Sequence, residues 1–192
     1  MQSHLATVLV ARALQLVGVV SLVACAPATP VSPAAAAANA SASTAPAALR
    51  PADNERAVFT WSATGSQNYE CRASDKGGFA WAFVGPEADL FDQSRRKVGL
   101  HGAGPFWAAL DGSRTIGTVK ASADGARPGD IPLLLLTTKP AGGPGRMTNI
   151  TSVQRLNTVG GKAPASGCET PPDAGKRVKQ GYTADYVFFA VP

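Results

Sequence analysis

The sequence has few of the side chains that build metal sites and nucleophilic active sites: its 192 residues include two histidines and three cysteines. Beyond the N-terminal segment His101 is the one histidine, so the usual set of histidine and cysteine ligands for a transition metal is missing. No Gly-x-Ser-x-Gly elbow and no EF-hand loop occurs, and Gly160-Gly161-Lys162 continues with alanine where a phosphate loop needs serine or threonine. We therefore predict neither a bound metal nor a cofactor.

Long helical patterns and concentrated charge are missing as well. After the N-terminal segment, no stretch of ten residues shows a convincing helical periodicity. The net charge is +5, but the two basic clusters, Arg95-Arg96-Lys97 and residues 176–179, have no aromatic residues interleaved with them. Such clusters are typical of solvated loops, and we predict no binding to nucleic acid.

The N-terminal segment contains an apolar run, residues 13–23, that is too short and too interrupted for a membrane-spanning helix, which needs about 20 apolar residues. The run ends in Leu22-Val23-Ala24-Cys25, which resembles the lipobox of bacterial lipoprotein signal peptides. The resemblance implies that residues 1–24 are a signal peptide and that Cys25 is lipidated. The partner would then be a lipid bilayer of the bacterial cell envelope, with the domain facing the periplasm or the exterior.

The next segment, residues 26–50, is made almost wholly of alanine, proline, serine and threonine. It has too little large apolar surface to offset the entropy lost on ordering, so we predict that residues 25–50 form a lipidated cysteine followed by a disordered linker. The remaining residues, 51–192, have the size of one ordinary domain.

Two cysteines remain once Cys25 is assigned to the lipid anchor. Cys71 and Cys168 either form a disulfide, as a pair does in an oxidising compartment, or stay as two buried thiols. The export signal favours the disulfide, which would close a loop of nearly the whole domain.

Within the domain the apolar residues recur with period two. Phe79, Trp81 and Phe83 share one face of a predicted strand, and residues 182–190 alternate in the same way, with a second face that becomes apolar towards its end. Further strands are predicted in residues 57–61, 68–72, 131–138 and 150–157. We also predict a hairpin with a type I′ turn at Asp111-Gly112 and a short helical turn near residues 86–90. About eight short strands separated by turns predict an all-β domain, either a β-sandwich or a small barrel.

Several segments together resemble the DUF3455 domain of exported bacterial and fungal proteins. The matching segments run in the family's order and include Tyr69-Glu70-Cys71, Trp81-Ala82-Phe83-Val84-Gly85-Pro86-Glu87-Ala88, Val98-Gly99-Leu100-His101, Asp111-Gly112-Ser113, Gln154-Arg155-Leu156-Asn157-Thr158, Gly160-Gly161-Lys162-Ala163-Pro164, Gly167-Cys168 and Tyr182-Thr183-Ala184-Asp185-Tyr186. The resemblance implies a single β-rich domain and implies no activity. Family members often have Gly-Pro-Thr-Trp-Glu where this chain has alanine at position 108, which weakens an enzymatic interpretation of that loop.

One hypothesis for the function is an envelope enzyme. His101 lies in a glycine-rich segment, residues 99–105, that we expect to be a flexible loop, and a histidine can serve as a base near neutral pH. Asp89, Asp92 or Asp185 would orient it, and we take His101 and Asp185 as the catalytic candidates. The alternative is a histidine that is hydrogen-bonded to loop backbone, which we favour because no motif marks a nucleophile.

The hypothesis that we prefer is a binding domain. His101 and Trp107 combine stacking with polar recognition, and Arg155 either pairs with Asp185 on a neighbouring strand or lines a pocket for an anionic ligand. We therefore take His101, Trp107 and Arg155 as ligand-binding candidates, with Tyr69 and Tyr186 as further aromatic surface. We expect a cell-envelope lipoprotein whose domain binds a small molecule, a glycan or a partner protein; a purely structural envelope component is the third alternative.

Overall fold

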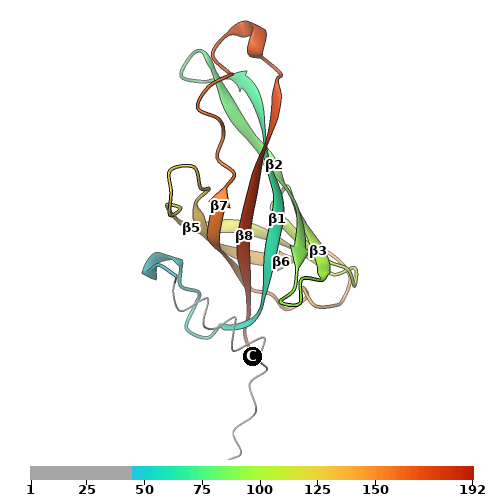
Figure 1. The fold of residues 1–192 in the computed structure, drawn as a ribbon. Helices are drawn as coiled ribbons and strands as arrows, with labels where there is room; N and C mark the ends of the chain where they lie inside the picture. Colours follow the sequence, from blue (N-terminus) through green and yellow to red (C-terminus); the bar gives the residue numbers. More distant parts are fainter. Residues whose placement is uncertain (1–44) are drawn as a thin grey trace, which may run out of the picture. The chain divides into compact units, whose positions relative to one another are not determined.

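The computed structural model describes residues 45–192, so the predicted signal peptide, the lipidation site Cys25 and most of the predicted linker lie outside the described residues. Eight strands form one closed antiparallel barrel in which each strand pairs with the next and the last pairs with the first (Figure 1). Their bounds are β1 (Arg56–Ala73), β2 (Phe79–Phe91), β3 (Lys97–Gly102), β4 (Phe106–Ala109), β5 (Arg114–Ala123), β6 (Leu133–Pro140), β7 (Ser152–Gly160) and β8 (Arg177–Ala190). The only helical elements in this part of the chain are two 3₁₀ turns, η1 (Ala47–Leu49) and η2 (Pro171–Asp173), and neither has the length and hydropathy needed to cross a membrane. The prediction of an all-β domain with about eight strands is confirmed, in its barrel form.

One half of the barrel interior is filled by large aromatic side chains from its two longest strands. Phe59 and Trp61 of β1 face Phe188 of β8, with ring centroids 4.7 and 5.2 Å from that of Phe188. The loop between β6 and β7 adds Met147 and Ile150 to the same buried cluster. Period-two alternation turns these side chains inwards, and their burial supplies much of the hydrophobic stabilisation of the domain.

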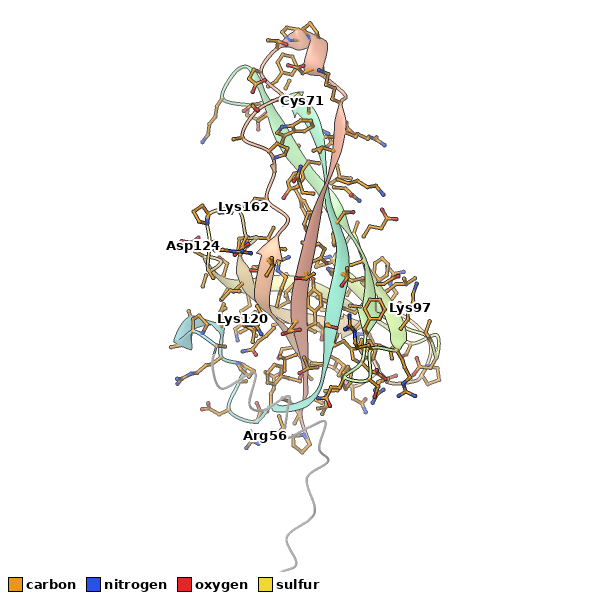
Figure 2. The ribbon with its side chains drawn as sticks, in the orientation of Figure 1. Arg56, Cys71, Lys97, Lys120, Asp124 and Lys162 are labelled. Carbon is orange, nitrogen blue, oxygen red and sulfur yellow. A yellow bond between two sulfur atoms is a disulfide. The ribbon has the colours of Figure 1, made fainter. Side chains whose placement is uncertain are left out.

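Beyond the other end of the barrel, β1, β2 and β8 continue together as a three-stranded extension (upper part of Figure 1). Near its tip, where Figure 2 labels Cys71, that cysteine is joined to Cys168 by a disulfide with a Cα–Cα distance of 5.5 Å. The predicted disulfide is therefore confirmed. The indole nitrogen of Trp81 donates to the carbonyl of Ser166 at 3.1 Å, which adds a second link between the extension and the segment that leads into η2.

The outer face of the barrel carries a second apolar cluster, which is covered by the chain that precedes β1. Leu49 of η1 is fully buried against Leu135, Val187 and Phe189, and its backbone carbonyl accepts a hydrogen bond of 2.6 Å from the side-chain amide of Gln154. The prediction of a disordered linker up to residue 50 is thus wrong for residues 45–50. Burial of the large apolar side chain of Leu49 offsets the conformational entropy that this short stretch loses on ordering. The folded domain therefore includes residues 45–50.

Two local predictions are also corrected. Residues 86–90 lie within β2 and form no helical turn, because they pair with β1 and β3 on either side. The predicted hairpin at Asp111-Gly112 joins β4 to β5, but only Gly112 has a positive φ, of 86°, so the turn is not of type I′. The Asp111 carboxylate instead accepts hydrogen bonds from the backbone and hydroxyl of Ser113 and fixes the turn.

Candidate functional site

A cavity of about 370 Å³ occupies the half of the barrel next to the extension. All eight strands contribute to its wall, and its lining includes Gln67, Phe83, His101, Trp107, Val119, Leu134, Arg155 and Tyr186. Phe59, Trp61 and Phe188, which fill the other half of the barrel, do not line this space. The cavity is therefore the part of the interior that these rings leave open.

The floor of the cavity is a cluster of three rings. His101 stacks on Trp107 with an interplanar angle of 18° and a centroid distance of 4.9 Å, and it contacts Tyr186 at 4.8 Å. Trp107 in turn meets Tyr186 edge to face at 5.4 Å. Such aromatic pairs add about 0.5–1.5 kcal/mol each beyond their buried area, so the floor is a rigid surface.

His101 lies in β3, directly opposite Trp107 of β4, and not in the flexible loop that the sequence predicts. The glycines beside His101, from which the loop was predicted, instead allow close packing between strands. A Cβ at Gly99 would lie 2.3 Å from the Ala108 carbonyl oxygen, and one at Gly102 would lie 2.4 Å from the Phe106 ring, so both positions need glycine for close packing. His101 is consequently 3% exposed.

The protonation state of His101 follows from its surroundings. Its Nδ1 lies 2.7 Å from the carbonyl oxygen of Phe106, which only accepts, so Nδ1 carries the proton and Nε2 is an acceptor. Burial lowers the pKa of His101 to about 3; the hydrogen bond to Phe106 opposes this shift and the positive charge of Arg155 contributes to it. The imidazole is therefore neutral at physiological pH.

The carboxylates expected beside His101 are not brought to it. Asp185 lies on the outer face of β8, where it accepts a hydrogen bond of 2.8 Å from the amide of Asn157, and Tyr186 takes the inward position next to it. Asp89 forms an ion pair with Lys97 on the outside of the barrel, and the Asp92 carboxylate accepts hydrogen bonds from the turn that follows it. Nor does Asp185 pair with Arg155, since the Arg155 side chain lines the cavity on the inner face of β7.

Arg155 is the charged group of the cavity. Its Nε donates a hydrogen bond of 3.0 Å to the carbonyl of Pro132, which fixes the plane of the guanidinium. Among residues 45–192, no carboxylate forms an ion pair with it. Burial raises the pKa of Tyr69, Tyr182 and Tyr186, and the charge of Arg155 opposes that rise in all three.

Two further donors in the cavity wall have no partner in the described part of the chain. The side-chain nitrogens of Gln67 and Trp107 are buried and form no hydrogen bond there. By contrast, the Tyr69 hydroxyl donates to the carbonyl of Gly161 at 2.8 Å, and the hydroxyls of Tyr182 and Tyr186 are 3.4 Å apart. Buried donors without partners are rare in proteins, so the unpaired nitrogens of Gln67 and Trp107 stand out.

The mouth of the cavity is apolar. Phe83, Val84 and Val119 line it, and they are 54%, 47% and 52% exposed. Phe83 packs against Tyr69 with a centroid distance of 5.5 Å, so the base of the extension forms one side of the mouth. An exposed apolar rim around a concave site is typical of a surface that receives a ligand.

A comparison with known protein families gives one result. The model of the DUF3455 family, described as a protein of unknown function, matches residues 51–190. The chain belongs to the DUF3455 family. No curated protein and no solved structure matches the chain. The matched region of this DUF3455 domain includes every strand of the barrel and every residue that lines the cavity, so the cavity is built wholly from the family's domain.

The three ligand-binding candidates from the sequence, His101, Trp107 and Arg155, all line the cavity of the DUF3455 domain, as do Tyr69 and Tyr186. Gln67 and the rim residue Val119 also line the cavity and were not predicted from the sequence. Gln67 occupies an inward position of the same alternation as Phe59 and Trp61, which is the signal that would have placed it inside. Within residues 45–192, no group of three or more histidine, cysteine, aspartate or glutamate side chains is arranged to hold a metal ion.

Proposed function

We propose that this DUF3455 domain binds a small, mainly apolar molecule in its barrel cavity, and that a lipid on Cys25 anchors it in the bacterial cell envelope. The observation that carries the proposal is the open half of the barrel, about 370 Å³ in volume. Sites for small molecules have volumes of about 300–1,000 Å³, and an eight-stranded barrel is wide enough to hold one small ligand. The anchor rests on the lipobox resemblance alone.

The chemistry of the wall supports an apolar ligand over a glycan. Rings and aliphatic side chains form the floor and the rim, and the polar groups are few and gathered near Arg155. A site with a large apolar surface and a small number of placed polar groups is typical of small-molecule binding. A sugar, whose hydroxyls each need a partner, would lose hydrogen bonds to water against such a wall.

The same geometry favours binding over catalysis. A general base needs a proton affinity near the working pH, whereas burial holds the pKa of His101 at about 3. Its Nδ1 is committed to the backbone carbonyl of Phe106, and no carboxylate candidate from the sequence reaches the ring. The imidazole therefore fits the role of a neutral stacking surface with one acceptor nitrogen.

The test is a binding measurement with a variant that blocks the cavity. The purified domain should bind an environment-sensitive apolar dye, such as an anilinonaphthalene sulfonate, with a rise in dye fluorescence. Val119→Trp places a large ring at the mouth and should weaken binding about ten-fold or more. Val159→Trp is the matched control, since Val159 is as exposed as Val119 and lies outside the cavity. Absence of dye binding to the wild-type domain, or equal weakening by both variants, would contradict the proposal.

A further inference from the structure

The cavity contains one permanent charge and no charge to balance it. Arg155 is the only lysine, arginine, aspartate or glutamate among the residues that line the cavity. An arginine remains protonated throughout the pH range in which proteins are stable. The interior of this half of the barrel is thus positively charged at every such pH.

An unbalanced charge in such a place is costly. The cavity wall is mostly apolar, so the guanidinium has lost part of its hydration, whereas every other arginine that forms an ion pair in residues 45–192 is more than half exposed. A charge that has lost hydration is stabilised most by a partner of opposite sign with good hydrogen-bond geometry. With Nε bonded to the Pro132 carbonyl and the guanidinium next to the Tyr186 hydroxyl, the terminal nitrogens of Arg155 still have N–H donors for such a partner.

The uncharged polar groups of the wall point to the same chemistry. Gln67 and Trp107 each bring a buried N–H without a partner, and neither group can change its protonation state. The terminal nitrogens of Arg155 add four N–H donors, whereas the acceptors of the ring cluster are Nε2 of His101 and the hydroxyl of Tyr186, so donors outnumber acceptors. A ligand that matches this wall presents acceptor oxygens to it.

Deepening the proposed function, and resting on it, we propose that the ligand is an apolar carboxylic acid whose carboxylate binds Arg155 inside the cavity. A carboxylate matches the planar guanidinium with two parallel hydrogen bonds, and its oxygens accept from the unpartnered amide or indole N–H. The hydrocarbon part of the ligand lies on the ring cluster of His101 and Trp107 and reaches the rim at Phe83.

The experiment uses three ligands with one hydrocarbon chain: decanoate, decanol and decylamine. Each displaces the bound dye from the wild-type domain near neutral pH, and the displacement curves give relative affinities. We expect decanoate to bind about ten-fold or more tightly than decanol, because a charge-assisted pair with arginine adds at least that much, and decylamine to bind most weakly. Vesicle-free conditions, below the concentration at which the ligands form micelles, keep the comparison to single molecules.

Two variants locate the effect. Arg155→Met should remove the preference for decanoate while decanol binds as before, and Arg155→Lys should retain part of the preference as a point charge. Lys120→Met is the control for total charge, since Lys120, labelled in Figure 2, is an exposed cation of β5 that does not line the cavity. It should leave the preference unchanged. Circular dichroism melts check that each variant is folded.

The outcomes separate this inference from the proposed function. If dye and decanol bind and Val119→Trp blocks both, but decanoate binds no better than decanol, the carboxylate inference is overturned and the apolar site stands. A preference that survives in Arg155→Met, or that Lys120→Met removes, also overturns it. If neither dye nor any of the three ligands binds, the proposed function itself fails. If Arg155→Met is unfolded, the inference is still tested by the preference of the wild-type domain for decanoate over decanol and by the reduced preference expected in Arg155→Lys.

Discussion

Acid should destabilise this domain through His101, by an amount that the structure sets. The imidazole is buried and neutral, with a pKa of about 3 in the folded state, whereas an unfolded histidine has a pKa of about 6.5. The unfolded chain therefore binds a proton that the folded chain does not. The contribution of His101 to stability is fully present above about pH 6.5 and is lost as the pH falls from there towards 3.

The size of the loss follows from the same two values. Each pH unit between them lowers the free energy of unfolding by about 1.4 kcal/mol, so the loss at pH 4.5 is about 2–3 kcal/mol relative to pH 7.5. This is a large part of the stability of a domain of ordinary size, which is about 5–15 kcal/mol. The effect should be visible as a shift of the urea midpoint.

Urea denaturation followed by circular dichroism, at pH 7.5 and at pH 4.5, measures this loss. His101→Asn is the reference, because the asparagine amide can donate to the Phe106 carbonyl as Nδ1 does and does not titrate. The carboxylates titrate in both proteins, so their effect cancels when the pH-dependent change in the free energy of unfolding of the variant is subtracted from that of the wild type. The wild type should lose about 2–3 kcal/mol more than the variant over this range. Equal losses in the two proteins, or a His101 pKa near 6.5 by NMR, would refute the argument.

Two other predictions concern stability. Replacing Cys71 and Cys168 together by serine should lower the free energy of unfolding by up to about 4–5 kcal/mol, because the disulfide links residues 97 positions apart; a loss below about 1 kcal/mol in urea would contradict this. Leu49→Ala should lower the free energy of unfolding by about 2–5 kcal/mol, because Leu49 is fully buried on the barrel wall. Ala48→Ser, at an exposed position of the same turn, should change it by less than about 0.5 kcal/mol. Equal effects of the two substitutions in urea denaturation would mean that η1 does not pack on the barrel in solution.

The sequence predicted the strands well because alternation is a local property. Phe79, Trp81 and Phe83 alternate with small residues, and both ends of β1 carry the same signal, but Gly65 between them hid that residues 57–61 and 68–72 are one strand. A Cβ at Gly65 would lie 2.2 Å from the carbonyl oxygen of Glu87, so the glycine permits close pairing with β2 and does not break the strand.

Contacts between distant parts of the chain could not be predicted in this way. The apolar second face at the end of β8 was visible in the sequence, but not that Leu49 covers it, because that contact joins residues far apart in the chain. The same holds for the site. His101, Trp107 and Arg155 were identified one by one from their chemistry, whereas the register of the closed barrel brings them to one cavity and turns Asp185 to the outside.

The buried titratable groups in and beside the cavity keep the same protonation state across neutral pH. His101 stays neutral down to a pH of about 3, and burial raises the pKa of Tyr69, Tyr182 and Tyr186, so these hydroxyls stay protonated in neutral solution. Arginine side chains are not deprotonated in proteins, and Arg155 is the one charged side chain among the residues that line the cavity. The cavity therefore presents the same charge at pH 5 as at pH 8, and any pH dependence of carboxylate binding belongs to the ligand. Affinity for decanoate should fall only as the ligand itself is protonated, below a pH of about 5, while affinity for decanol stays constant for as long as the domain remains folded.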